Sequence, residues 1–132
     1  MDSSAEKQKE QFRILVIEDD YANRLFFCEY LSFCGFDVYS LANGLDIEYQ
    51  LKTIQPHLLV LDIGLPEIDG YALLRIIRGS KQWQTLPIVV VSGYAFEGDR
   101  QKALSLGAQR YLVKPVRLRE LSTTVKSILP VE

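Results

Sequence analysis

Hydrophobic residues gather in short runs along this chain, and longer mixed segments separate them. Four runs are almost wholly apolar and rich in β-branched residues, at positions 14–17, 58–61, 88–91 and 111–113, and a weaker fifth spans 36–41. Runs of this length and composition are typical of strands that are buried on both faces of a parallel sheet. The pattern therefore predicts five strands covered by helices.

The segments between the runs carry apolar residues at helical spacing. Helix boundaries are indicated by Gly35 as a left-handed C-terminal cap, Pro56 as a stop, and Asp69 as an N-terminal cap. The five predicted stripes contain, in chain order, Phe26, Phe27, Tyr30 and Leu31; Ile47, Leu51 and Ile54; Leu73, Leu74 and Ile77; Phe96, Ala103 and Leu104; and Leu118, Leu121, Val125 and Ile128. Alternating strands and helices predict an α/β fold, a doubly wound five-stranded parallel sheet of strand order 2-1-3-4-5 with helices on both faces.

Polar residues follow four of the predicted strands directly. Glu18 and Asp19 follow the first run, Asp62 the run at 58–61, Ser92 the run at 88–91, and Lys114 the last run. Ligands of open parallel sheets bind beyond the carboxyl ends of the strands. We therefore expect these side chains to converge on one site, with Asp20 acting as a helix cap beside it.

The chemistry of this set points to phosphoryl transfer. Two carboxylates about 4 Å apart repel each other by about 4 kcal/mol at an effective dielectric constant of 20, so three of them need a cation or a proton. Oxygen ligands favour Mg²⁺. A carboxylate can carry a phosphoryl group, while a lysine and a hydroxyl stabilise its oxygens. The sequence predicts a magnesium-assisted phosphoryl site.

Composition and length limit the other classes of function. The chain has 132 residues, 48% of them hydrophobic and 24% charged, with a net charge of −2. This composition is typical of a single globular domain and offers no basic field for nucleic acid. No apolar stretch approaches the roughly 20 residues that cross a bilayer, so we expect a cytoplasmic protein without membrane contact. Cys28 and Cys34 are expected to be free thiols.

The whole set of motifs resembles the receiver domain of two-component response regulators. The resemblance rests on Glu18-Asp19-Asp20, on the segment 61–70 with its Asp-Ile-Gly-Leu-Pro sequence, on Val91-Ser92, and on the segment 111–115 that ends in Lys-Pro. It implies a flavodoxin-like receiver fold over residues 12–129. Residues 1–11 would then be a flexible polar tail, and residues 130–132 the C-terminal end.

The resemblance also implies roles for the residues at the strand ends. Asp62 would accept the phosphoryl group, Asp19 would bind Mg²⁺ directly with Glu18 as its acidic neighbour, and Gly64 would supply a backbone carbonyl. The phosphodonor would be a histidine kinase or a histidine phosphotransfer protein. The protein would then be a signalling switch rather than an enzyme with an external substrate.

Three further residues would sense the phosphoryl group. Lys114 would pair with it, through a loop that contains a cis bond to Pro115, and Ser92 would move towards it. Tyr111 would turn into the space that Ser92 leaves. This movement would alter the face made by the helix near 96–104, the strand 111–113 and the last helix, and it could drive homodimerisation.

Some features of the sequence bear on which type of receiver domain this chain is. Few residues follow the last helix, which favours a stand-alone receiver that signals by protein contacts, and the segment 95–100 resembles phosphorelay shuttles or hybrid-kinase receivers. Leu25 and Phe33 would line the kinase contact. Tyr94, two residues after Ser92, would shield the phosphoryl group and slow its hydrolysis, and Gly64, two residues after Asp62, has no side chain to orient a water. More remote alternatives are a flavodoxin-like cofactor binder and an aspartate-dependent phosphatase.

Overall fold

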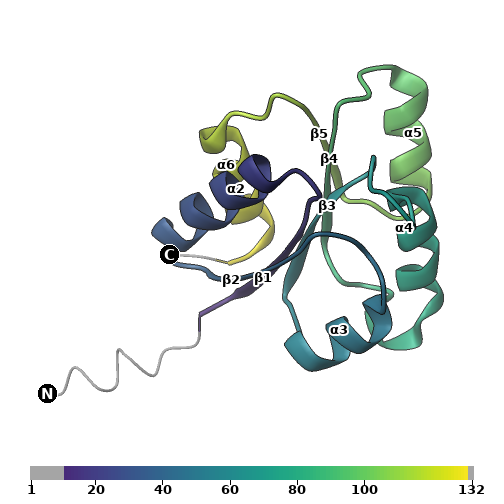
Figure 1. Cartoon of the computed structure of the whole chain (residues 1–132), viewed down its shortest axis with the longest axis horizontal. Coiled ribbons are helices and arrows are strands. Elements are labelled where there is room, and N and C mark those ends of the chain that lie inside the picture. Colours follow the sequence, from purple (N-terminus) through teal and green to yellow (C-terminus); the bar gives the residue numbers. More distant parts are fainter. Residues whose placement is uncertain (1–10, 131–132) are drawn as a thin grey trace, which may run out of the picture.

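The computed structural model of the chain describes residues 11–130 and contains one five-stranded sheet (Figure 1). All four strand pairs are parallel, and their order is β2-β1-β3-β4-β5, which confirms the predicted topology. The strands are β1 (Arg13–Ile17), β2 (Asp37–Leu41), β3 (Leu58–Asp62), β4 (Ile88–Ser92) and β5 (Arg110–Val113).

Helices cover both faces of this sheet. Figure 1 shows α2 and α6 on one side and α3, α4 and α5 on the other. Their bounds are α2 (Tyr21–Phe33), α3 (Ile47–Ile54), α4 (Gly70–Gly79), α5 (Glu97–Ser105) and α6 (Leu118–Ile128), with a short 3-10 helix η1 (Lys81–Trp83). None of the helices within residues 11–130 is long and apolar enough to cross a membrane.

Two apolar layers hold the helices against the sheet. On β1, Leu15 and Ile17 pack towards α3 and α4, whereas Ile14 and Val16 pack with Phe27 of α2 and with α6. The alternation follows from the period of two in a strand. Burying each such side chain contributes about 1.5–3 kcal/mol. The central strands are thereby fixed in register, and with them the residues at their ends.

Side-chain caps start the helices next to the strand ends. The Asp20 carboxylate accepts a hydrogen bond from the backbone N–H of Asn23 at 3.1 Å and caps the start of α2, as expected. Asp69 accepts from the Ala72 amide at 2.9 Å and begins α4. Each cap satisfies one of the free N–H groups of its helix and contributes about 1 kcal/mol. The loops that carry the acidic residues are therefore short and anchored.

The structure corrects two residues of the predicted apolar stripes. Phe26 is 61% exposed and Phe96 is 81% exposed, so neither belongs to the core. Phe27 faces the sheet in place of Phe26, and Phe96 lies at the N-cap of α5 instead of inside the helix. Residues 1–10 of the predicted tail and residues 131–132 lie outside the described residues. Gln11 donates a hydrogen bond to the Gly35 carbonyl.

Gly70 should tolerate no side chain. A Cβ atom at this position would lie 2.5 Å from the Ile63 Cα and 2.8 Å from the Asp62 carbonyl oxygen, both backbone atoms. We expect Gly70→Ala to lower the free energy of unfolding by roughly 1–3 kcal/mol, measured by urea denaturation. Gly98→Ala is the matched control, because Gly98 lies in α5 with nothing within 4 Å, and it should be neutral or stabilising. Equal effects of the two changes would contradict the steric argument.

Candidate functional site

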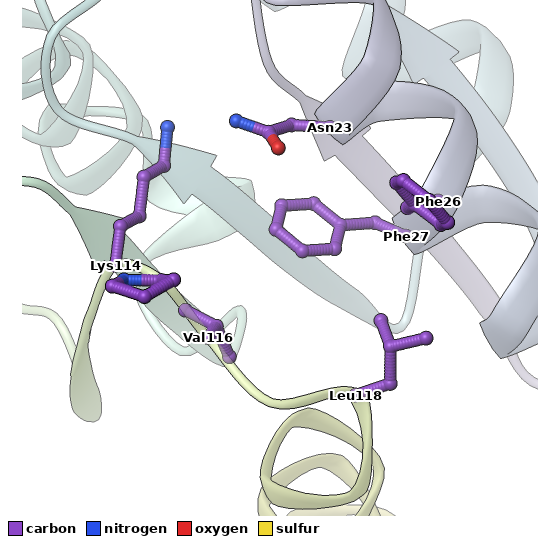
Figure 2. A pocket seen from close by; sticks show the side chains of 7 residues that line it. Asn23, Phe26, Phe27, Lys114, Val116 and Leu118 are labelled. Atoms are coloured by element: carbon purple, nitrogen blue, oxygen red, sulfur yellow. The ribbon is translucent and has the colours of Figure 1, made fainter.

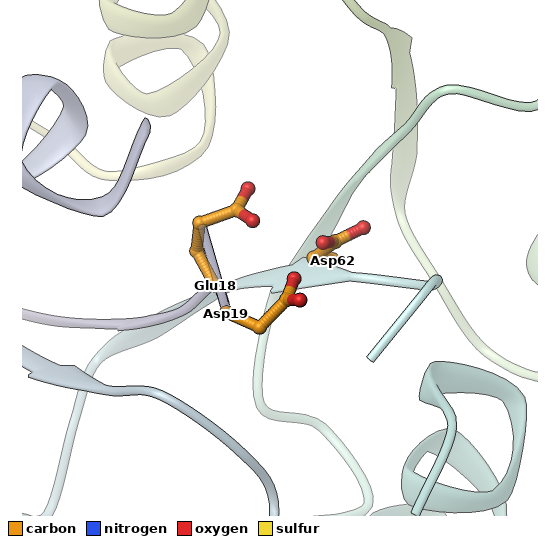
Figure 3. Close-up of side chains that lie close together, drawn as sticks. All are labelled: Glu18, Asp19 and Asp62. Carbon is orange, nitrogen blue, oxygen red and sulfur yellow. The ribbon is translucent and has the colours of Figure 1, made fainter. Parts of the chain in front are cut away.

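Three carboxylates meet at the carboxyl ends of β1 and β3. Ile17 pairs with Leu61, so Glu18, which follows β1, and Asp62, the last residue of β3, lie side by side. Oxygen atoms of Glu18, Asp19 and Asp62 lie within 4.8 Å of one another, and Figure 3 shows the three side chains gathered at this point. Glu18 and Asp62 are buried, whereas Asp19 is exposed. The convergence predicted from the sequence is therefore present.

Lys114, which directly follows β5, adds a positive charge to this cluster at the same edge of the sheet. Its Nζ atom lies 2.8 Å from Glu18 Oε1 and 3.3 Å from Asp62 Oδ2. The backbone N–H of Lys114 donates to the Ser92 carbonyl at 2.8 Å, which fixes the loop after β5, and the bond to Pro115 is cis as expected. One ammonium thus faces two buried carboxylates.

Burial and crowding change the acidity of this pair. Burial raises the pKa of Glu18 to about 7, although Lys114 and the Asp20 N–H both act to lower it, and the Asp62 charge raises it further. Burial alone would lower the pKa of Lys114. The neighbouring carboxylates of Glu18 and Asp62 outweigh that effect and raise the pKa of Lys114 above its usual value. Lys114 is therefore charged, and Glu18 holds its proton more tightly than an ordinary glutamate.

The donor atoms fit a hard divalent cation. Glu18 Oε1 is buried and has no hydrogen-bond partner within residues 11–130, since its ion pair with Lys114 lacks hydrogen-bond geometry. Asp19 offers an exposed carboxylate within reach of the same point. A cation there would relieve the repulsion among three acids and would keep water ligands on its open side, as Mg²⁺ does.

Ser92 and Tyr111 both bond to the backbone of Tyr94, but they differ in burial and in hydrogen-bond role. Ser92 ends β4 and is 1% exposed, and its Oγ accepts a hydrogen bond from the Tyr94 N–H at 3.0 Å. Tyr111 is half-buried, and its hydroxyl donates to the Tyr94 carbonyl at 2.8 Å. Burial raises the pKa of Tyr111. The loop through Tyr94 therefore links these two side chains.

The loop after β3 lies against the same cleft. The Gly64 N–H donates to Asp62 Oδ1 at 3.1 Å and holds that carboxylate in place. The Tyr94 hydroxyl lies 3.8 Å from the position that a Cβ of Gly64 would occupy. The half-exposed phenol of Tyr94 therefore lies next to the space that a side chain at position 64 would fill, beside the Asp62 carboxylate.

A groove beside the cleft was not foreseen from the sequence. It has a volume of about 450 Å³ and runs between α2 and the loop that leads into α6. Figure 2 shows the Asn23 amide and the Lys114 ammonium at one end of it, and the Phe27 ring along its wall. Its lining consists of Asn23, Phe26, Phe27, Lys114, Pro115, Val116 and Leu118. The sequence signal that could have indicated this groove is the pair of adjacent phenylalanines, Phe26 and Phe27, because both rings cannot face the sheet.

Comparison with known proteins identifies the class. The family model described as the response regulator receiver domain matches residues 14–126, and the chain belongs to this family. Receiver domains are signalling modules that bind Mg²⁺ at their acidic site and interact with histidine kinases or phosphotransfer proteins. The predicted resemblance is thereby confirmed.

Individual relatives differ in length. The transcriptional regulatory protein GltR of Pseudomonas aeruginosa is 38% identical over 116 residues, which cover 88% of this chain and 48% of GltR. The chain thus spans about half the length of this relative. The polar-differentiation response regulator DivK of Brucella anthropi is 25% identical over 116 residues, which cover 88% of this chain and 94% of DivK.

Solved structures agree with the fold. The CheY-like receiver domain protein of Methanospirillum hungatei has a TM-score of 0.83 and 29% identity, covering 92% of this chain and 95% of that one. The receiver domain of sensor histidine kinase PA1611 of Pseudomonas aeruginosa has a TM-score of 0.81 and 28% identity, covering 89% and 97%. That structure has a magnesium ion coordinated in its active-site cleft.

Proposed function

We propose that this receiver accepts a phosphoryl group on Asp62 from a histidine kinase or a histidine phosphotransfer protein. The observation that carries the proposal is the position of the buried Asp62 carboxylate, which lies 3.3 Å from Lys114 Nζ and beside Glu18 and Asp19. Glu18, Asp19 and Asp62 would hold Mg²⁺ together with the Gly64 carbonyl. The bound ion would neutralise charge on the transferring group.

In the proposed reaction a carboxylate oxygen of Asp62 attacks phosphorus. A bond from this oxygen to phosphorus forms while the bond from phosphorus to the donor nitrogen breaks, and the imidazole leaves with the electron pair. The Gly64 N–H donates to Asp62 Oδ1 and the Lys114 ammonium donates to Oδ2, so both oxygens of the attacking carboxylate are held in place. Lys114 then pairs with the phosphoryl oxygens, because its ammonium already faces this carboxylate.

The switch would pass through Ser92 and Tyr111. The Ser92 hydroxyl would donate to a phosphoryl oxygen, and its movement towards that group would lengthen the hydrogen bond that its Oγ now accepts from the Tyr94 N–H. A turn of Tyr111 into the vacated space would break its bond to the Tyr94 carbonyl. We propose that the face of α5, β5 and α6 changes in this way, and that homodimerisation through it is one readout.

Mass spectrometry of the intact protein tests the proposed function. Incubation with MgCl₂ and acetyl phosphate should give an adduct of about 80 Da, the mass of one phosphoryl group on a carboxylate. EDTA should prevent its formation. Continuous release of phosphate over many turnovers would instead support the phosphatase, and a bound yellow flavin would support the cofactor binder.

A stand-alone receiver over residues 12–129 is the domain organisation that we propose. The match covers 94% of DivK, so a receiver of this length can form nearly a whole response regulator, whereas it covers only 48% of GltR. A phosphorelay shuttle remains the second reading. It differs in one measurable respect, namely that the phosphorylated protein would pass its phosphoryl group on to a phosphotransfer protein.

The kinase contact is proposed to lie on α2. Leu25 is 43% exposed and Phe33 is 87% exposed, and Phe26 of the same helix is 61% exposed and lines the groove that reaches Lys114. We expect the double change Leu25→Ser and Phe33→Ser to slow phosphotransfer from a phosphorylated histidine phosphotransfer protein at least several-fold. Phosphorylation by acetyl phosphate serves as the control and should keep its rate. Unchanged phosphotransfer in the folded variant would remove these residues from the contact.

Tyr94 should lengthen the life of the aspartyl phosphate. Its hydroxyl lies beside Gly64 and near the Asp62 carboxylate, where it would hinder the approach of an attacking water. We expect Tyr94→Ala to hydrolyse several-fold faster, followed as loss of the adduct after removal of acetyl phosphate. Phe96→Ala is the control, because Phe96 lies in the same loop and is 81% exposed. A variant as slow as the wild type would refute shielding.

A further inference from the structure

Arg24 of α2 holds the backbone of the acidic loop. Its Nη1 atom donates to the Glu18 carbonyl at 2.8 Å and lies 3.4 Å from the Asp19 carbonyl. We infer that Arg24 is a positioning residue for metal binding, which sets the place of the two acidic side chains through their backbone. This inference rests on the proposed function, in which Glu18 and Asp19 bind Mg²⁺.

The helix explains how Arg24 reaches this loop. Arg24 lies one turn after the cap residue Asp20, and side chains on a helix lean towards its N-terminus. Its guanidinium therefore folds back over the start of the helix. The Tyr21 ring lies 5.5 Å from the Arg24 Cζ atom and packs against the same guanidinium. The position of the guanidinium is thus supported from two sides.

The acidic loop needs such an anchor because the sheet ends before it. The Glu18 N–H still donates to the Leu41 carbonyl at 3.1 Å, which continues the pairing of β1 with β2. The Glu18 carbonyl is instead held by Arg24. Repulsion among three carboxylates within 4.8 Å favours movement of the exposed Asp19 side chain into solvent. Fixing the Glu18 and Asp19 carbonyls restricts that movement.

Arg24 acts on carbonyl oxygens rather than on the carboxylates. Its contacts with Glu18 and Asp19 leave their carboxylate oxygens available to a cation. Lys114 differs, because it pairs with the carboxylates of Glu18 and Asp62 themselves. An outer group that orients metal ligands in this way typically supports their affinity by 10–100-fold.

The direction in which Mg²⁺ affinity changes on replacement of Arg24 distinguishes a positioning role from a simple effect of its charge. A guanidinium near the site repels a divalent cation, so removal of its charge alone would tighten Mg²⁺ binding. Loss of positioning would weaken binding. Arg24→Gln removes the charge and the forked donor together, and therefore we expect about tenfold weaker Mg²⁺ binding against the electrostatic trend.

Calorimetric titration of the full chain with MgCl₂ tests this inference. Arg24→Gln should raise the Kd about tenfold, within the range for outer-shell groups, and Arg24→Lys should recover part of the affinity through its one donor group. Arg100→Gln is the matched control, because Arg100 carries the same charge on exposed α5, beside Glu97, and its loss should leave the Kd unchanged. Thermal unfolding in EDTA reports separately on any loss of stability.

Each outcome decides the inference. Equal or tighter binding by Arg24→Gln would overturn it, even if the variant were less stable in EDTA. If Arg24→Gln does not fold, Arg24→Met, which keeps a long unbranched side chain but lacks the donors, gives the same comparison. Absence of Mg²⁺ binding by the folded wild type would overturn the proposed function itself, which distinguishes that failure from failure of the inference alone.

Discussion

Asp62→Asn is expected to abolish the phosphoryl adduct formed with acetyl phosphate and Mg²⁺. The amide has no anionic oxygen with which to attack phosphorus, and it also removes one of the two carboxylates that face Lys114. The variant should stay folded, because the change removes a charge that repels Glu18. Intact-protein mass spectrometry after incubation measures the result directly.

Asp69→Asn is the matched control for this change. Asp69 lies seven residues further along and uses its carboxylate to cap α4. Asparagine caps a helix about as well as aspartate, so the fold should be preserved. The control should gain about 80 Da like the wild type, the mass expected of an aspartyl phosphate. An adduct of equal yield in Asp62→Asn would place the acceptor elsewhere and refute the proposed function.

The site was predictable because topology brings together residues that the sequence keeps apart. Glu18, Asp19 and Asp62 each follow a buried apolar run, and parallel pairing places the ends of β1 and β3 side by side. Lys114 is predictable by the same argument, since β5 pairs with β4 in parallel. The apolar pattern alone was sufficient for these placements, and the capping roles of Asp20 and Asp69 follow from local chemistry.

Other features depend on directions that an apolar pattern does not encode. Phe26 and Phe27 are neighbours about 100° apart on a helix, and their spacing alone cannot decide which ring faces the sheet. The structure buries Phe27 and exposes Phe26, which forms a wall of the groove. Arg24 was missed because a hydrogen bond to a backbone carbonyl leaves no trace in composition or periodicity.

The pKa of Glu18 also required the structure, and it makes metal-free stability depend on pH. The carboxyl titrates near 7 in the folded protein, against 4.5 as its ordinary value. Below pH 4.5 both folded and unfolded chains are protonated. Between these values the unfolded chain loses its proton first, so stability is lost as pH rises towards the folded pKa. The separation corresponds to roughly 3 kcal/mol at full extent.

Glu18→Gln should therefore flatten the pH dependence of stability in EDTA. We expect the wild type to lose roughly 2 kcal/mol more unfolding free energy than the variant between pH 5 and pH 8, measured by urea denaturation. Glu120→Gln, an exposed change on α6, is the control and should follow the wild type.

Addition of MgCl₂ at pH 8 should stabilise the wild type more than Glu18→Gln, so that the wild type becomes the protein with the higher free energy of unfolding. Mg²⁺ would bind the ionised carboxylates of the folded wild type and stabilise it by mass action, because one Lys114 ammonium faces three carboxylates and the ion would add the missing positive charge. Glu18→Gln loses one acidic oxygen donor and should gain much less from the ion. Equal stabilisation of both proteins by Mg²⁺ would show that Glu18 is no part of the metal site, while equal pH dependence in EDTA would show that its burial does not control its proton.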